Sequence, residues 1–218
     1  MPYWFASAIW DRYTSMTEMR DVLVFDYDGV LADTEPLHWK SWAALLSRYD
    51  VQLGWEDYCT FGRGIDDAQM YKTLQNRALL PGTDDFVNQN RERKRIVQEW
   101  SLAEIPISTE TIAMLKGLDG FRIGLVTSSE RSEVEPVLRA AQIYDVFDAM
   151  VFGDEVAAPK PSPAPYQLVA QKLGIDTGIA FEDSEPGLAS ARTAGFRAIK
   201  VEHPKDLPQI VAQSLAVV

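Results

Sequence analysis

Five short apolar runs recur along this chain, and helical patterns fill much of the space between them. The runs span residues 22–25, 122–126, 149–152, 178–181 and 197–201, and the helical patterns span 109–118, 134–141, 165–173 and 186–194. Strands that alternate with helices predict a parallel sheet with helices on both faces. The sequence therefore predicts an α/β fold, a doubly wound parallel sheet with a Rossmann-like core.

Residues 34–103 interrupt this alternation and have an almost entirely helical pattern. Pro36 lies at a predicted helix start, and Trp39, Trp42, Leu46 and Tyr49 form an apolar stripe after it. Four of the six tryptophans lie in this region, which favours an insertion with a core of its own. We therefore predict an all-helical domain at 34–103, inserted into a catalytic core formed by 21–33 and 104–218.

Two further segments have simpler predictions. Residues 1–20 form an N-terminal extension rich in aromatic residues, for which three interpretations stay open: an amphipathic helix packed on the body, a dimer contact, or a stretch upstream of the start used in the cell. The charged run at 91–95 is predicted to be the solvated face of a helix.

The composition limits the partners of this protein. Its net charge of −11 at pH 7 argues against nucleic acid, because a phosphate backbone requires a basic surface. No apolar run approaches the ~20 residues of a membrane span, so we expect no membrane partner. The single cysteine, Cys59, excludes an internal disulfide and favours a reducing compartment. We expect a cytoplasmic monomer or weak homodimer.

Asp26 and Asp28 follow the first apolar run, at the point where a buried strand ends. Their side chains point the same way if the extended conformation persists, and Gly29 then permits a sharp turn close to a ligand. Burying two carboxylates together costs several kcal/mol unless a cation or a shared proton compensates. The alternative is that both residues only cap the following helix and solvate a loop.

Polar side chains also follow two other apolar runs. They are Thr127, Ser128 and Ser129 after the second run, and Glu182, Asp183 and Ser184 after the fourth. Taken singly, each group is typical of a helix start. Because the carboxyl ends of parallel strands share one edge of the sheet, where ligands bind, we expect both groups to meet Asp26 and Asp28 there.

Lys160 is the basic residue that such an acidic cluster requires. It lies in Ala158-Pro159-Lys160-Pro161-Ser162-Pro163, where three prolines restrict the backbone. A rigidly held lysine is suited to neutralising a phosphate or a buried acid. Without the acids, the default interpretation would be an exposed lysine in a stiff loop.

Taken in order, these motifs resemble those of the haloacid dehalogenase-like phosphatases that have a helical cap. The motifs are DxDGVLADTE, VTSS, KPSP and FEDS, and they cover roughly residues 21–203. Within that superfamily, Glu182-Asp183 and Asp33-Thr34-Glu35-Pro36-Leu37-His38 look most similar to the β-phosphoglucomutase-like and sugar-phosphatase subgroup. The resemblance implies that the helical insertion is a cap domain.

The resemblance also implies the chemistry. Asp26 would attack phosphorus to give an aspartyl-phosphate, and Asp28 would protonate the leaving group and then activate water. Mg²⁺ would be held by Asp26, the backbone carbonyl of Asp28, Asp183, and Glu182 directly or through water. Lys160 would balance the negative charge that the phosphate and Asp26 bring together.

The remaining candidate site residues would bind the substrate. Thr127 and the amide of Ser128 would hold phosphoryl oxygens, with Gly29 and Ser129 beside them. In the cap, Arg63 lies between two glycines at a predicted loop tip and would contact the substrate. His38 follows the hinge and would reach the site, although a structural or exposed histidine fits the sequence equally well.

The predicted function is a Mg²⁺-dependent phosphatase acting on a small phosphorylated metabolite, with a sugar phosphate as the expected substrate class. The alternatives are a phosphomutase, which is an isomerase, and a non-catalytic binding homologue. The intact acids and Lys160 oppose the latter. Two acidic residues, Asp67 and Glu130, lie where the mutases under comparison have basic residues, so the sequence favours hydrolysis over phosphoryl transfer to a second sugar hydroxyl.

Overall fold

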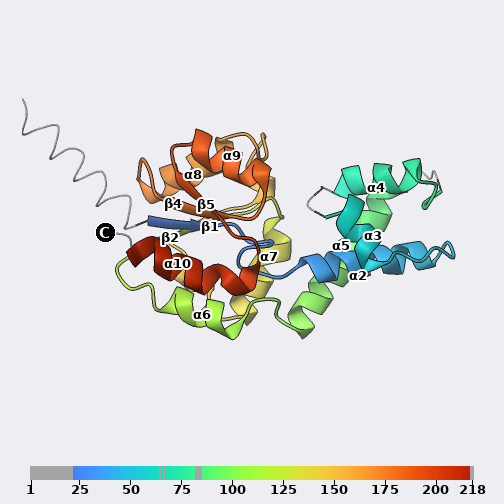
Figure 1. Cartoon of the computed structure of the whole chain (residues 1–218), viewed down its shortest axis with the longest axis horizontal. Helices are drawn as coiled ribbons and strands as arrows, with labels where there is room; N and C mark the ends of the chain where they lie inside the picture. The colour runs from blue at the N-terminus through green and yellow to red at the C-terminus, as the bar shows by residue number, and fades with distance from the viewer. Residues whose placement is uncertain (1–21, 64, 66, 82–84, 217–218) are drawn as a thin grey trace, which may run out of the picture. The chain divides into compact units, whose positions relative to one another are not determined.

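The computed structural model describes residues 22–63, 65, 67–81 and 85–216 (Figure 1). The predicted extension at 1–20 lies outside these residues. The described chain divides into two compact units, one formed by the residues up to Asp33 together with those from Ile107 onward, the other by Thr34–Pro106. Among the described helices, none combines the length and the apolar composition that crossing a membrane requires.

The described part of the first unit is built on a parallel sheet of five strands, which confirms the predicted α/β class. Its strands, in the spatial order β3-β2-β1-β4-β5, are β3 (Ala149–Val151), β2 (Arg122–Val126), β1 (Val22–Phe25), β4 (Ile179–Glu182) and β5 (Arg197–Lys200). The chain order reverses at β1, between β2 and β4. Ligand sites in open α/β sheets lie at the carboxyl ends of the strands at such a reversal.

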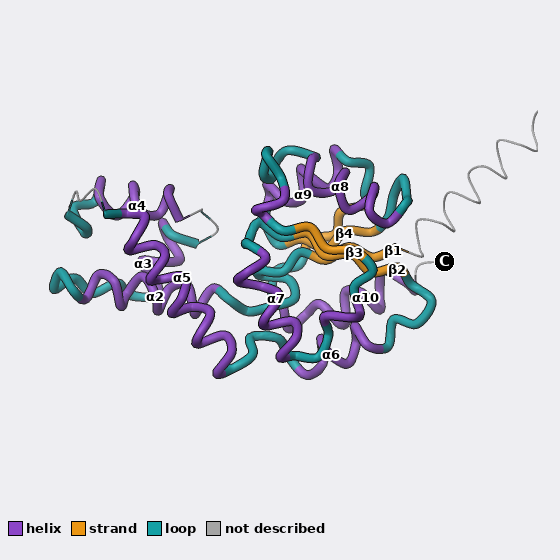
Figure 2. The backbone as a smooth tube through the Cα atoms, turned by 180° about the vertical axis from the view of Figure 1, so that it is seen from behind, coloured by secondary structure: helices purple, strands orange, loops and turns teal. Residues whose placement is uncertain are grey.

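Helices cover both faces of this sheet (Figures 1 and 2). On one face lie α8 (Ala164–Leu173) and α9 (Glu185–Thr193), and on the other lie α6 (Thr109–Lys116), α7 (Arg131–Ala140) and α10 (Leu207–Ala216). Short 3-10 turns η1 (Tyr144–Val146), η2 (Gly153–Glu155) and η3 (Pro204–Asp206) complete the unit.

The strand β1 is buried along its whole length because helices cover it on both sides. Val22 and Val24 belong to a core with Val169 of α8 and Ala191 of α9. Phe25 stacks on Phe181 of β4, with ring centroids 5.0 Å apart. Asp26 therefore lies at the carboxyl end of a fully buried apolar strand in the middle of the sheet.

In its described residues the second unit contains four helices: α2 (Glu35–Ser47), α3 (Trp55–Phe61), α4 (Asp67–Asn76) and α5 (Phe86–Ala103). It has its own hydrophobic core, in which Trp42 and Leu46 of α2 pack with Tyr58, Met70 and Leu74. Trp39 and Tyr49 pack against this core while remaining partly exposed. The apolar stripe predicted from the sequence is therefore the inner face of α2, and Tyr49 continues it just after the helix ends.

The prediction that residues 91–95 form the solvated face of a helix was wrong for Arg93, which is only 2% exposed. The helix α5 turns Arg93 toward α2, where its guanidinium lies 4.5 Å from the centre of the Trp42 ring. It donates to Ser41 Oγ at 3.0 Å and forms an ion pair with Asp67. Burial of this arginine is possible because these partners compensate its charge.

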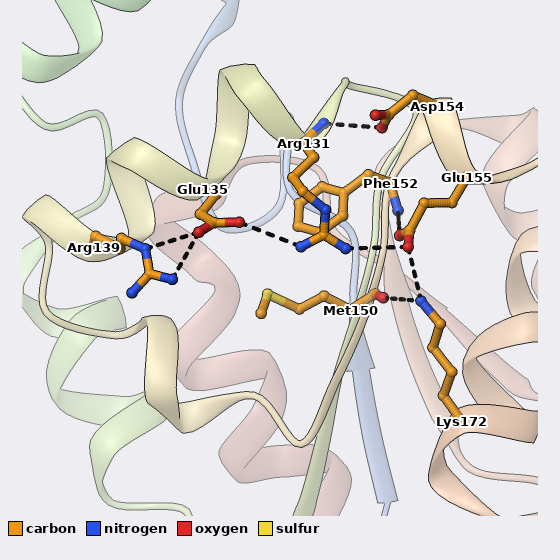
Figure 3. A network of polar contacts seen from close by, with 8 residues as sticks. All are labelled: Arg131, Glu135, Arg139, Met150, Phe152, Asp154, Glu155 and Lys172. Atoms are coloured by element: carbon orange, nitrogen blue, oxygen red, sulfur yellow. Dashed lines mark hydrogen bonds and ion pairs between the residues drawn. The ribbon is translucent and has the colours of Figure 1, made fainter.

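A network of polar contacts closes the β3 edge of the sheet (Figure 3). Lys172 of α8 donates to the backbone oxygen of Met150 at 2.7 Å, and Glu155 accepts from the backbone nitrogen of Phe152 at 2.9 Å. Arg131 joins Glu155 at 3.1 Å and stacks over the Phe152 ring. Side chains therefore satisfy outward-facing backbone groups at this edge, where another strand would otherwise pair.

Candidate active site

Asp26 occupies the carboxyl end of the central strand. Its backbone nitrogen donates to the oxygen of Phe181 at 3.0 Å, which extends the pairing of β1 with β4 by one residue. The side chain is 6% exposed, and its Oδ1 accepts from the backbone nitrogen of Tyr27 at 2.7 Å. The sheet and the first peptide of the turn thus fix this carboxylate in place.

The turn after Asp26 lies close to Asp183, the residue that follows β4. Gly29 has φ of +71° and donates its backbone N–H to the oxygen of Ala32 at 2.9 Å. A Cβ at Gly29 would lie 2.2 Å from Oδ2 of Asp183. Glycine is therefore required here both by the positive φ and by the close approach of Asp183.

Three carboxylates converge at this edge of the sheet. Asp26, Glu182 and Asp183 each offer an oxygen, and these oxygens all lie within 4.8 Å of one another. Burial raises the pKa of Asp26 well above its usual range, and the charges of Glu182 and Asp183 raise it further against the opposing effect of Lys160. A cation bound among these oxygens would relieve that repulsion.

Lys160 is the positive charge within the cluster. Its Nζ lies 2.7 Å from Oε1 of Glu182, 3.1 Å from Oδ1 of Asp26 and 3.2 Å from the backbone oxygen of Val126. Three acceptors match the three hydrogens of an ammonium group. Burial alone would lower the pKa of Lys160, but the charges of Asp26 and Glu182 outweigh it and raise that pKa, so the side chain stays protonated.

Glu182, the last residue of β4, is completely buried and its two oxygens have different surroundings. Oε1 accepts from Lys160 Nζ and from the Tyr166 hydroxyl, each at 2.7 Å. Oε2 is buried without a hydrogen-bond partner among the described residues. An unpartnered buried carboxylate oxygen beside two aspartates fits a site for a hard divalent cation such as Mg²⁺.

The hydroxyl-rich loop after β2 completes the cluster. Thr127 is 2% exposed, its backbone nitrogen donates to the oxygen of Val151 at 3.0 Å, and its Oγ1 accepts from the backbone nitrogen of Ser129 at 3.0 Å. Ser129 Oγ donates to Oδ2 of Asp28 at 2.7 Å. The structure therefore brings Asp28 and the loop of Thr127, Ser128 and Ser129 together, although about a hundred residues separate them in sequence.

Contacts from η2 hold this loop and the start of α7 in position, and Figure 3 shows the one between Asp154 and Arg131. The backbone nitrogen of Gly153 donates to the oxygen of Ser129 at 2.9 Å. Asp154 accepts from the backbone nitrogen of Arg131, at the first residue of α7, at 3.0 Å. The loop is thus fixed at both ends, by the sheet before it and by η2 beside it.

The two remaining candidate residues belong to the second unit. Arg63 is exposed just after α3, and its backbone nitrogen donates to the oxygen of Tyr58 at 3.0 Å. His38 is partly buried on α2, with its Nδ1 3.4 Å from Nη1 of Arg93. Because an arginine always donates, Nδ1 of His38 is the acceptor and Nε2 carries the proton in the neutral ring.

Sequence reasoning did not identify Tyr166 or Arg93 as polar partners. Tyr166 lies on the inner face of a predicted helix, where an aromatic residue is ordinarily a core residue, and Arg93 lies in a charged run. No local signal distinguishes either residue from its neighbours, since both partnerships form between elements distant in sequence.

Comparisons with known proteins find relatives over most of the chain. A model of the haloacid dehalogenase-like hydrolase family matches residues 23–201. The chain is 30% identical to a phosphorylated carbohydrates phosphatase of Thermotoga maritima, covering 82% of this chain and 83% of that protein. It is also 30% identical to the fructose-1-phosphate phosphatase YqaB of Escherichia coli, covering 82% of this chain and 95% of that protein.

A solved structure has the same fold. It is that of CbbY from Rhodobacter sphaeroides in complex with phosphate, with a TM-score of 0.69 and 27% identity, covering 84% of this chain and 86% of that chain.

Proposed function

Because this chain belongs to the haloacid dehalogenase-like hydrolases, we propose that it is a Mg²⁺-dependent phosphatase that hydrolyses a small sugar phosphate through an aspartyl-phosphate. The observation that carries this proposal is the convergence of Asp26, Glu182 and Asp183 around Lys160 at the carboxyl edge of the sheet. The names of the relatives, which act on phosphorylated carbohydrates and fructose 1-phosphate, support the substrate class.

In the first step, a carboxylate oxygen of Asp26 attacks phosphorus. The new oxygen–phosphorus bond forms as the bond from phosphorus to the ester oxygen breaks, and Asp28 gives its proton to the departing alkoxide. In the second step, Asp28 takes a proton from water as the water oxygen attacks the same phosphorus. The bond to Asp26 breaks, inorganic phosphate is released and the carboxylate is restored.

In the proposed mechanism, the surrounding residues balance the negative charge and keep the reacting groups in position during both steps. Mg²⁺, held by Asp26, the backbone carbonyl of Asp28, Asp183, and Glu182 directly or through water, would neutralise charge on the transferring group. Lys160 keeps its proton and faces Asp26. Thr127, the amide of Ser128, Ser129 and the turn at Gly29 are the proposed contacts for phosphoryl oxygens.

Specificity is assigned to the second unit, which we propose is the cap. The substrate-contacting roles of Arg63 and His38 stay predictions. A location in the cytoplasm is also part of the proposal, supported by the single cysteine among 218 residues.

The preference for hydrolysis over a mutase reaction depends on Glu130 more than on Asp67. Asp67 forms an ion pair with Arg93, so its charge is balanced and would repel a second phosphate only weakly. Glu130 forms a capping box with Glu133 at the start of α7. The preference rests on the acidic Glu130 after the serines and on the names of the phosphatase relatives.

The test is a screen of hexose and pentose phosphates with Mg²⁺ and with a chelator, following release of inorganic phosphate. We expect metal-dependent release from at least one sugar phosphate. A parallel reaction contains a hexose 1-phosphate and a trace of its 1,6-bisphosphate. Rapid appearance of the 6-phosphate with little inorganic phosphate would replace the phosphatase assignment with a mutase.

A further inference from the structure

Tyr166 is a fully buried tyrosine whose hydroxyl points at the carboxylate cluster. We propose that Tyr166 is a positioning residue for the metal site: by holding Oε1 of Glu182, its hydroxyl keeps Oε2 directed toward a divalent cation shared with Asp26 and Asp183. The inference rests on the proposed Mg²⁺ site and adds to it a residue outside the strand-end motifs.

The contacts of Glu182 show how its two oxygens are divided. Oε1 accepts two hydrogen bonds, from the Tyr166 hydroxyl and the Lys160 ammonium, each at 2.7 Å. Oε2 accepts none from the described residues although it is buried. One oxygen is thus committed to the protein, and the other is left for a ligand that the protein does not supply.

Tyr166 is the more rigid of the two donors. Tyr166 lies on α8, and its ring packs in the core against the sheet, with its centroid 5.3 Å from that of the Phe196 ring. Lys160 divides its three hydrogens among Glu182, Asp26 and Val126, whereas the Tyr166 hydroxyl donates its single hydrogen to Glu182. The direction of the Glu182 carboxylate therefore depends on the tyrosine hydroxyl.

The opposite side of the carboxylate is closed by α9. A Cβ at Gly187 would lie 1.9 Å from Oε2 of Glu182, so only glycine leaves room for this oxygen. With Gly187 on one side and Tyr166 on the other, rotation of the carboxylate is restricted. Removing the hydroxyl relaxes one side of this restraint and leaves Lys160 as the one described donor to Oε1.

The experiment compares Tyr166→Phe with wild type, using Tyr144→Phe as the matched control. Tyr144 lies in the same unit, with its ring under the Arg139 guanidinium at 3.6 Å, outside the cluster. The dissociation constant for Mg²⁺ alone is measured by calorimetry, and the far-ultraviolet circular dichroism confirms the fold. Hydrogen-bonding partners of metal ligands typically contribute 10–100-fold in affinity, so we expect Tyr166→Phe to bind Mg²⁺ about 10-fold more weakly and Tyr144→Phe to match wild type.

A double-mutant cycle with Glu182→Gln separates positioning from a general packing effect. If Tyr166 acts through Glu182, the double variant binds Mg²⁺ no more weakly than Glu182→Gln alone, whereas independent effects would add. An unchanged dissociation constant in Tyr166→Phe, or additive losses in the double variant, would overturn the inference and leave the proposed phosphatase intact. Wild-type protein that binds no Mg²⁺ would overturn both.

Discussion

The Asp26 carboxylate receives two donors on Oδ1, the Tyr27 amide and the Lys160 ammonium, and lies beside two further acids. In the proposed mechanism this carboxylate attacks phosphorus, and a bound Mg²⁺ would compensate the charge of the neighbouring acids. The surroundings of the carboxylate explain why its pKa is raised, because burial and the two acids together exceed the effect of one lysine.

Replacing Asp26 by asparagine should abolish turnover while preserving the fold. Loss of a covalent nucleophile typically costs ~10⁴-fold or more in kcat. Because asparagine also removes a buried negative charge, the free energy of unfolding without metal should be no lower than that of wild type. Steady-state kinetics and urea denaturation in chelator test both expectations, and near-normal turnover would remove Asp26 from the nucleophile role.

Replacing Lys160 by methionine should destabilise the metal-free protein. The substitution keeps the apolar stem and removes the charge that faces Asp26 and Glu182. Removing one partner of a buried ion pair typically costs about 3–5 kcal/mol. Urea denaturation measures the loss, and Lys205→Met is the control because Lys205 is exposed. Equal, small losses in both variants would show that Lys160 does not stabilise the acidic cluster.

At the scale of single elements, α5 has two opposite faces of different character. Arg91 and Arg95 are exposed, whereas Arg93 lies against α2 between Trp42 and Asp67. Two residues, about half a helical turn, therefore separate a solvated arginine from a structural one.

Replacing Arg93 by methionine should destabilise the second unit strongly, by about 3–5 kcal/mol, because Asp67 and Ser41 lose a buried partner. Arg91→Met on the exposed face should change the free energy of unfolding by no more than about 0.5 kcal/mol. Both are measured by chemical denaturation followed by tryptophan fluorescence, since Trp42 lies in this core. A methionine tolerated equally well at both positions would mean that the Arg93 contacts contribute little to stability.

At the scale of the whole molecule, the two units have separate hydrophobic cores. The proposed metal ligands all belong to the unit that contains the sheet. Metal binding should therefore be coupled to the stability of that unit.

Adding Mg²⁺ should raise the apparent Tm of the wild-type protein. A ligand at 100 times its Kd stabilises the native state by about 2.7 kcal/mol. The shift should nearly vanish in Asp183→Asn and persist in Asp176→Asn, since Asp176 is exposed before β4. Thermal denaturation with Mg²⁺ and with chelator provides the measurement. A wild-type Tm that does not respond to Mg²⁺ would argue against a divalent site at this edge.

The sequence by itself determined the class of fold and the edge of the sheet where chemistry gathers. Apolar runs alternating with helical patterns predict a parallel sheet, and parallel strands bring their carboxyl ends to one edge. Asp26, Thr127 and Glu182 could therefore be assigned to one place without coordinates. Such predictions succeed because they depend on the local periodicity of apolar residues and on the rule that ligands bind at the carboxyl ends of parallel strands.

Only the tertiary structure decided which side chains pair within that frame. It placed the Tyr166 hydroxyl on Glu182 and buried Arg93 against Asp67. These contacts join residues of different elements. The distance between such residues along the sequence follows no periodic pattern, so sequence analysis cannot identify them as partners. Whether a charged or aromatic residue is exposed or buried depends on the side chains that neighbouring elements place against it. Those neighbours are known only from the tertiary structure.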